Sequence, residues 1–327
     1  MKLVNIDTAG GWRVAAVSDG HIFDLNRAVQ LSMAGGRAAT SAVRQAADRI
    51  MPPDMRAWLA LGHPERMEAA HQALKTAVEI AGGQPESSRL SSGLCWSETT
   101  VPLAPAVPEF ASVFAVGLNF PSHVEEAGAQ VPKWPIIFAK PRNSIERHNA
   151  TIPLPSASRR IDYEGELAVV IGAECKAVAE EDALSFVAGY TIANDLSARD
   201  WQFRTSEMMI GKALDGFCPL GPYLTTLDDC PDVGSLAITT LINGETRQSA
   251  SLSEMLFGVS HIVSYISQVI TLQPGDAVLM GTPAGTGVTM DPRRWLGPED
   301  VVEIEITGLG RLVTTMAAPT ATKADGN

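Results

Sequence analysis

Three acidic residues stand close together in the stretch RIDYEGELAVVIG, residues 160 to 172. Apolar residues alternate with other residues there, which predicts a strand covered on both sides, and alternate side chains of a strand share one face. Asp162, Glu164 and Glu166 would then point the same way. Two buried carboxylates repel each other unless one takes up a proton or a cation lies between them. A solvated edge strand is the alternative for the pair alone.

A third acid ends the next apolar strand candidate, VAGYTIANDLSARDWQ, residues 187 to 202. Strand ends present ligands on a rigid support, and Asp195 comes at such an end. Together with Glu164 and Glu166 it makes a set of three carboxylates. Oxygen ligands suit Mg²⁺, Mn²⁺ or Ca²⁺, and the lack of a nearby His or Cys pair disfavours Zn²⁺. The sequence predicts a divalent-cation site.

A second group that could perform chemistry is in VFAVGLNFPSHVEEAG, residues 113 to 128. His123 and Glu126 are three residues apart in a predicted helical turn, so their side chains can meet. A carboxylate bonded to one imidazole nitrogen raises the basicity of the ring and leaves the other nitrogen free to take a proton from water. A surface contact is the alternative, and the neighbouring Glu125 could replace Glu126.

Positively charged residues accompany the acids. Lys212 is surrounded by apolar residues in MIGKALDGFCPLGP, where a lone ammonium group needs an anion, although a surface lysine is the alternative. Arg199 and Gln202 follow Asp195 closely enough to share its site, and a guanidinium group suits a substrate carboxylate. The loop GTPAGTG, residues 281 to 287, lacks the Lys and Ser or Thr of a phosphate-binding loop, so a tight turn is the alternative there.

Four of these segments resemble the fumarylacetoacetate hydrolase family. They are the E-x-E strand, the ND-x-SARD-x-Q segment, the GK-x-x-D-x-F-x-P-x-GP segment and the GTPAG-x-G loop, and they occur in the family's order. The resemblance implies that Glu164, Glu166 and Asp195 hold a divalent metal, usually Mg²⁺. It also implies that His123 and Glu126 form a catalytic pair on a lid over the metal.

The resemblance implies further site residues. Lys212 would lie near the metal and hold an enolate or carboxylate oxygen, while Thr282 and nearby amides would face the substrate carboxylate. Lys140, in IIFAKPRNSI, is expected to bind substrate. Phe120, Gly165 and Ala213 differ from the residues usual in the family, and these differences leave the substrate open. The far side of its pocket is expected to contain Phe120, Trp134, Trp201 and N-terminal loops.

We therefore expect a metal-dependent hydrolase that cleaves a carbon-carbon bond of a small anionic 2,4-diketo acid or acylpyruvate through a metal-held enolate. His123 and Glu126 would activate the water, and Lys212 and Arg199 would balance charge. One alternative is a hydratase, isomerase or decarboxylase of 2-oxo-alkenoic or dioic acids in aromatic catabolism. Another is a non-catalytic metal- or ligand-binding module. The resemblance also implies a homodimer.

The elements that must position these residues divide the chain in two. Strands at residues 2 to 7, 12 to 18 and 21 to 26 precede helices at residues 38 to 50, 53 to 62 and 64 to 80. The Pro-rich segment LAPAVPEF then marks a boundary. We predict an N-terminal α+β domain at residues 1–106, a catalytic domain at residues 107–318 and a mobile tail at residues 319–327.

The second part is rich in strand candidates. Asn243 and Gly244 form a two-residue hairpin turn, and apolar residues at helical spacing predict a helix between Leu252 and Ile270. By resemblance the fold class is α+β, mostly β: a mixed β roll or sandwich behind the smaller N-terminal domain.

Composition limits the remaining possibilities. A net charge of -12 argues against nucleic acid as a partner. No apolar run approaches the roughly 20 residues of a membrane span, and no signal peptide is evident, so the cytoplasm is expected. The four cysteines show no paired spacing and are expected to be reduced. Because the protein is acidic, a site for an anionic substrate must supply local cations or a metal.

Overall fold

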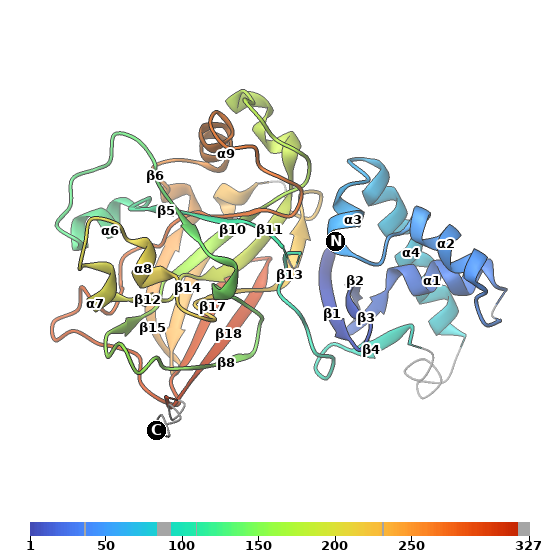
Figure 1. The fold of residues 1–327 in the computed structure, drawn as a ribbon, viewed down its shortest axis with the longest axis horizontal. Helices are drawn as coiled ribbons and strands as arrows, with labels where there is room; N and C mark the ends of the chain where they lie inside the picture. Colours follow the sequence, from blue (N-terminus) through green and yellow to red (C-terminus); the bar gives the residue numbers. More distant parts are fainter. Residues whose placement is uncertain (36, 84–92, 109, 231, 320–327) are drawn as a thin grey trace, which may run out of the picture.

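The computed structural model describes residues 1–35, 37–83, 93–108, 110–230 and 232–319. A smaller N-terminal unit lies beside a larger, strand-rich unit (Figure 1). The predicted α+β, mostly β fold class is confirmed, with 32% of the residues in strands and 26% in helices. The predicted domain boundary between residues 106 and 107 remains a proposal. From residue 320 on, the predicted tail lies outside the described residues.

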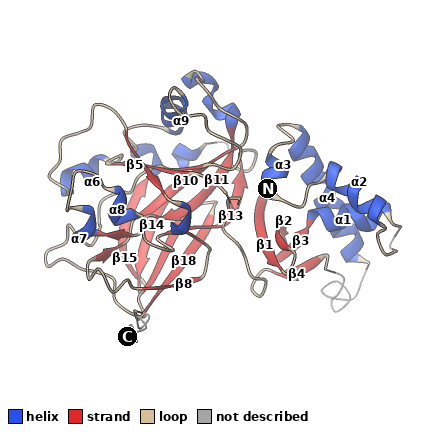
Figure 2. Cartoon of the chain, viewed as in Figure 1, coloured by secondary structure: helices blue, strands red, loops and turns tan. Residues whose placement is uncertain are grey.

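The N-terminal unit places its helices on the outer side of a small group of strands (Figure 2). Its helices begin where polar side chains accept backbone N–H groups: Asp24, Thr40 and Asp54 cap the first three. The strand predicted to reach residue 26 ends at Asp24 for this reason. The elements are β1 Lys2–Thr8, β2 Gly11–Ser18, β3 His21–Asp24, α1 Leu25–Met33, α2 Ser41–Ile50, α3 Met55–Leu59, α4 Glu65–Gly82 and β4 Cys95–Ser97.

One long mixed sheet connects the two units, in the order β4-β3-β2-β1-β13-β11-β10-β16-β5-β6, with β7 paired to β13. The connection is the antiparallel pairing of β1 with β13, in which Leu3 lies opposite Leu224. The strands of this sheet in the larger unit are β5 Val113–Gly117, β6 Ile136–Lys140, β7 Ile145–Glu146, β10 Gly165–Ile171, β11 Val187–Asn194, β13 Cys218–Thr226 and β16 Ala277–Leu279.

A five-stranded sheet, in the order β15-β14-β17-β18-β8, completes the larger unit. It consists of β8 Ala150–Pro153, β14 Ala237–Ile242, β15 Glu245–Ser251, β17 Val301–Ile306 and β18 Gly310–Ala317. A short pair, β9 Ile161–Asp162 and β12 Ser197–Ala198, lies apart from both sheets. The helices are α6 Pro121–Glu126, α7 Arg199–Gln202, α8 Met209–Lys212 and α9 Val259–Ser267, with 3₁₀ turns η1 Arg142–Ser144, η2 Glu180–Phe186, η3 Val233–Ser235 and η4 Leu252–Glu254.

Strands β10 and β11 lie at the centre of the core and are buried at every residue. Leu167 and Val169 of β10 pack with Ile304 of the second sheet, whereas Ala168 and Val170 belong to the cluster on the opposite face. The expected coverage on both sides is therefore confirmed. Because both faces are occupied by apolar side chains, the charged residues of this region collect at the ends of the strands.

Two local predictions required correction and one was confirmed. The strand predicted over residues 160 to 172 is divided into β9 and β10. The helix predicted from Leu252 begins only at Val259, because Ser251 and Glu254 form a capping box around the separate turn η4. The hairpin turn at Asn243 and Gly244 is confirmed, with φ angles of 52° and 79°.

Two expectations based on composition can be compared with the structure. The four cysteines are thiols, as expected, and all four are buried. Among the helices in the described ranges, none combines the length and the apolar character that crossing a membrane requires.

Gly165, between the two glutamates, has no room for a side chain. A Cβ atom there would lie 2.2 Å from Thr240 Oγ1 and 3.1 Å from Ile304 Cγ2, which explains why no β-branched residue occurs at this position. We expect Gly165→Ala to lower the free energy of unfolding by about 1–3 kcal/mol, because the added methyl group overpacks the core. Urea denaturation measures the change.

The exposed Gly82, at the end of α4, offers a matched control because its Cβ position meets no atom within 4 Å. Gly82→Ala should change the stability by less than about 0.5 kcal/mol. Adding Thr240→Ala to the Gly165→Ala protein should restore part of the loss. Equal stability of Gly165→Ala and the unaltered protein would contradict this account of the packing.

Candidate functional site

Three carboxylates meet where β10 begins and β11 ends. The two strands are antiparallel with Gly165 opposite Asn194, so Glu164 and Glu166 lie beside Asp195. One oxygen atom from each lies within 4.8 Å of the others, and all three residues are buried. The structure therefore brings together the three acids that the sequence proposes as metal ligands.

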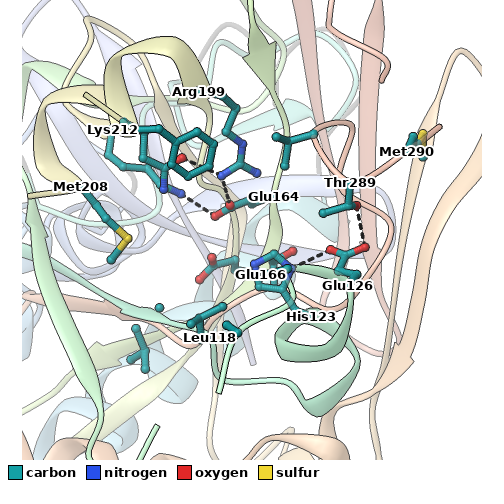
Figure 3. Close-up of a pocket in the computed structure, with 18 of the residues that line it drawn as sticks. Leu118, His123, Glu126, Glu164, Glu166, Arg199, Met208, Lys212, Thr289 and Met290 are labelled. Atoms are coloured by element: carbon teal, nitrogen blue, oxygen red, sulfur yellow. Dashed lines mark hydrogen bonds and ion pairs between the residues drawn. The ribbon is translucent and has the colours of Figure 1, made fainter. Parts of the chain in front are cut away.

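Two cations contact this cluster, as Figure 3 shows for Glu164. Lys212 Nζ lies 2.5 Å from Glu164 Oε2 and 2.8 Å from Asp195 Oδ2, and Arg199 Nη1 lies 2.8 Å from Glu164 Oε1. Burial alone would raise the pKa of Glu164, but the charges of Lys212 and Arg199 lower it far below its usual value. Glu164 is therefore ionised. Lys212 is no surface lysine.

Glu166 differs from its two neighbours because no ion pair reaches it among the described residues. Its Oε2 accepts the N–H of Gly281 at 2.7 Å. Burial, followed by the charges of Asp195 and Glu164, raises the pKa of Glu166 well above its usual value. Glu166 therefore keeps a proton unless a further cation neutralises the cluster.

The balance of buried charge fits a divalent cation. Four carboxylates face three positive side chains here, so the cluster is neutral while Glu166 keeps its proton and carries one excess negative charge when Glu166 is ionised. The acids are Asp162, Glu164, Glu166 and Asp195, and the cations are Lys140, Arg199 and Lys212. An excess buried charge is costly without a partner, and carboxylate oxygens suit a hard ion such as Mg²⁺. Glu164, Glu166 and Asp195 would hold it.

Lys140, at the end of β6, lies behind Asp195. Its Nζ donates to Asp195 Oδ1 at 2.5 Å, to the carbonyl of Phe217 at 2.7 Å and, more weakly, to the carbonyl of Leu196 at 3.4 Å. A lysine has three N–H donors, so all of them are used within the protein. The substrate-binding role of Lys140 stays a prediction, and the geometry favours a role in orienting Asp195.

His123 and Glu126 meet on helix α6, with His123 Nδ1 2.7 Å from Glu126 Oε1. Pro121 begins this helix, as its sequence position predicts, and Glu125 is exposed. Burial alone would raise the pKa of Glu126, but hydrogen bonds from His123, Gly285 and Thr289 outweigh it and lower the pKa. Glu126 is therefore a carboxylate that accepts the Nδ1 hydrogen, which leaves Nε2 as the basic nitrogen.

The other predicted substrate ligands lie around the same cavity. Arg199 Nη1 also donates to Gln202 Oε1 at 2.9 Å, whereas Arg199 Nη2 is buried and has no partner among the described residues. The hydroxyl of Thr282 donates to the carbonyl of Gly165 and accepts from Gln248. The hydroxyl of Thr282 is thus already committed within the protein, and the roles of these residues toward substrate remain proposals.

A cavity of about 680 Å³ joins the carboxylate cluster to the His123 and Glu126 pair. Its apolar wall includes Phe138, Met208, Val288 and Met290, and Arg293 also lines it. This differs from the expected aromatic wall for three reasons. Phe120 is fully buried in the core, Trp134 stacks on Tyr265, and the indole of Trp201 donates to the carbonyl of Ala157. The N-terminal residues also lie outside the lining.

Sequence reasoning missed the support that Asp162 provides. Its carboxylate accepts from Arg199 Nε at 2.8 Å and from the N–H groups of Gly287 and Val288 at 2.8 and 3.1 Å. It therefore connects a predicted substrate ligand to the loop at residues 281 to 289. The position of Asp162 near the two glutamates in the sequence could have indicated a role in the site. Its contacts with the loop could not be predicted in this way, because Gly287 and Val288 are more than 120 positions away.

The protonation of Glu166 leads to a test of the metal site. Since Mg²⁺ must displace that proton, binding should release about one proton per site and become tighter as the pH rises. Titration calorimetry in two buffers of different ionisation enthalpy measures the release. Glu166→Gln should weaken binding at least about tenfold.

Glu174→Gln is the matched control, because Glu174 is an exposed acid remote from the cluster. Its Mg²⁺ affinity should equal that of the unaltered protein. Tight binding with identical heats in both buffers would show that Glu166 does not hold the proton.

Known proteins match both the C-terminal part of the chain and the whole fold. The human protein named "Oxaloacetate tautomerase FAHD2B, mitochondrial" is 43% identical over 223 residues, 67% of this chain and 70% of its own. The structure of fumarylacetoacetate hydrolase from psychrophilic Exiguobacterium antarcticum matches with a TM-score of 0.71 and 30% identity, over 97% of this chain and 99% of that one.

A second solved structure, 2-hydroxyhepta-2,4-diene-1,7-dioate isomerase from Mycobacterium marinum, matches with a TM-score of 0.68 and 29% identity over 97% of this chain and 98% of that chain. Residues 112–317 match the family described as Fumarylacetoacetate (FAA) hydrolase C-terminal. This segment contains all ten predicted site residues, from His123 to Thr282. The chain belongs to the fumarylacetoacetate hydrolase family.

Proposed function

We propose that this protein is a divalent-metal-dependent enzyme acting on small 2-oxo acids, in which His123 is the general base. The observation that carries the proposal is the single cavity that His123 and the buried acidic cluster share. A base oriented by a carboxylate beside a site for a hard cation suits proton transfer at a carbon next to a carbonyl, or activation of water.

Glu164, Glu166 and Asp195 are the proposed ligands of the metal, with Mg²⁺ favoured and Mn²⁺ or Ca²⁺ as alternatives. When bound, the ion would supply Lewis acidity toward the carboxylate and 2-oxo oxygens of the substrate. A divalent ion that displaces the proton of Glu166 would change the charge of the buried cluster from 0 to +1. The site then attracts an anion, although the protein as a whole carries a net charge of -12.

In the hydrolytic reaction, His123 Nε2 takes a proton from water, whose oxygen forms a bond to C4 of a 2,4-diketo acid. The C3 to C4 bond then breaks, and its electron pair remains at C3 as an enolate. Lys212 and Arg199 face this developing negative charge. A proton returned by His123 to C3 completes the reaction, which converts acetylpyruvate and water to pyruvate and acetate.

Keto-enol tautomerisation is the second candidate, and the 43% identity to a protein named oxaloacetate tautomerase favours it. Here His123 would move a proton between C3 and the 2-oxo oxygen without any attack by water. Isomerase, hydratase and decarboxylase reactions use the same enolate. In each of these reactions that uses His123 to transfer a proton, Glu126 would orient the imidazole.

Substrate tests distinguish these reactions. With Mg²⁺ and acetylpyruvate, we expect pyruvate, measured with a lactate dehydrogenase assay. Faster loss of enol absorbance from oxaloacetate, without pyruvate release from acetylpyruvate, would instead favour the tautomerase. Metal binding without turnover of a panel of diketo and oxo acids would contradict both reactions and favour the non-catalytic binding module.

Paired substitutions test the base. Glu126→Gln should lower kcat by roughly 10²- to 10⁴-fold, because the oriented base contributes about this factor. Glu125→Gln removes the adjacent, exposed carboxylate and should leave kcat unchanged. If the two variants have the same activity, a base oriented by Glu126 is not part of the mechanism.

The homodimer, the cytoplasmic location and a place in aromatic catabolism belong to the same proposal. Light scattering measures the mass of the assembly directly. Fractionation of the source cells tests the location, and a compartment other than the cytoplasm would contradict it; the name of the human relative gives mitochondria for that protein.

A further inference from the structure

Glu126 is held mainly by a loop that is far from it in the sequence. Its Oε2 accepts the N–H of Gly285 at 2.8 Å and the hydroxyl of Thr289 at 2.7 Å. Its Oε1 accepts the hydroxyl of Thr286 at 3.0 Å and the ring of His123 at 2.7 Å. Three of the four donors thus belong to residues 285–289, which we call the clamp loop.

The clamp loop is anchored in the core on its opposite side. Asp162 accepts the N–H groups of Gly287 and Val288, and the hydroxyl of Tyr163 donates to the carbonyl of Gly285 at 2.8 Å. Gly285 has a φ of +106°, and a Cβ there would lie 2.0 Å from the carbonyl oxygen of Arg247. The backbone of the loop is therefore closely packed, so its side chains offer donors at defined positions.

The two threonine hydroxyls contact different oxygens of Glu126: Thr286 contacts Oε1, which His123 also contacts, and Thr289 contacts Oε2. Thr289 could also donate to the carbonyl of Thr286 at 2.8 Å, but a charged carboxylate is the stronger acceptor for its single hydrogen. Figure 3 shows Thr289 and His123 contacting different oxygens of the Glu126 carboxylate. Neither hydroxyl contacts the acidic cluster in any described interaction, so the two could be removed without loss of a proposed metal ligand.

An imidazole that is held by a carboxylate at Nδ1 keeps its hydrogen there and presents Nε2 as a base. The effect depends on the carboxylate keeping its own orientation. Without the clamp loop, Glu126 would lie near the end of the six-residue helix α6 and could rotate toward solvent. The hydroxyl donors therefore act on His123 through Glu126.

We propose that Thr286 and Thr289 are positioning residues that fix the orientation of Glu126 and thereby select the Nδ1–H tautomer of His123. The inference rests on the proposed function of His123 as the base. It adds Thr286 and Thr289 to the site. Neither threonine was among the site residues predicted from the acids and the histidine. It also makes the clamp loop part of the catalytic arrangement.

Valine and serine substitutions test this proposal. Thr286→Val and Thr289→Val keep the shape of the side chain and remove the hydroxyl, whereas Thr286→Ser and Thr289→Ser keep the hydroxyl. Each valine variant should lower kcat roughly 10- to 100-fold, the range for losing an orienting partner of a site residue, with KM changed less than about threefold. The serine variants should retain most of kcat.

A measurement of the tautomer separates the proposal from the proposed function, because it needs no turnover. Long-range ¹H–¹⁵N spectra identify which ring nitrogen carries hydrogen, and comparison with His123→Gln assigns the signal among the six histidines. The unaltered protein should show the Nδ1–H form. The double valine variant should show a mixture or the Nε2–H form, and the double serine variant should show the Nδ1–H form.

Controls exclude a loss of folding. Thr307→Val, at an exposed threonine far from the site, should match the unaltered protein in all measurements. The Mg²⁺-dependent rise in Tm should persist in both single valine variants. Its persistence would show that these variants are folded. If the His123 signal is unchanged in folded valine variants, the proposal is wrong, whether or not the protein proves to be a hydrolase. A change confined to the valine variants supports it.

Discussion

Compensation of buried negative charge is the constraint on which the rest of this site depends. Glu164, Glu166 and Asp195 occupy a buried region, where like charges repel strongly. Lys212 and Arg199 neutralise part of that charge from one side, and Lys140 does so from behind. When Glu166 is ionised, the compensation is incomplete by one charge, and that deficit makes the cluster suitable for a cation and then for an anionic substrate.

The fold supplies this cluster through the arrangement of its sheets. Strands β10 and β11 are covered by apolar side chains on both faces, so only their ends can carry charge at low cost. The close approach of the second sheet also limits which residue can lie between Glu164 and Glu166. Thr240 leaves no room for a side chain at position 165, so only glycine fits there. The packing of the core at Gly165 therefore also constrains the positions of the two glutamates.

The base and the acidic cluster are mechanically connected through Asp162. This residue holds Arg199 with one oxygen and the loop at residues 287 to 288 with both, and the same loop holds Glu126. A displacement of the loop would therefore affect both sides of the cavity. This shared support explains why a short helix such as α6 can carry a base at a defined position.

The sequence by itself determined the chemical types present: three acids at strand ends, a histidine and glutamate one helical turn apart, and the ordered motifs of the family. The acids and the histidine–glutamate pair follow from local periodicity and spacing, which also predicted most helices and the Asn243 turn correctly, whereas the motifs follow from resemblance. Only the tertiary structure decided which cations pair with which acids, that Lys140 points to Asp195, and that Thr286 and Thr289 reach Glu126. Those contacts join residues between 17 and 163 positions apart, and no local pattern encodes such pairings, because they result from the packing of whole sheets.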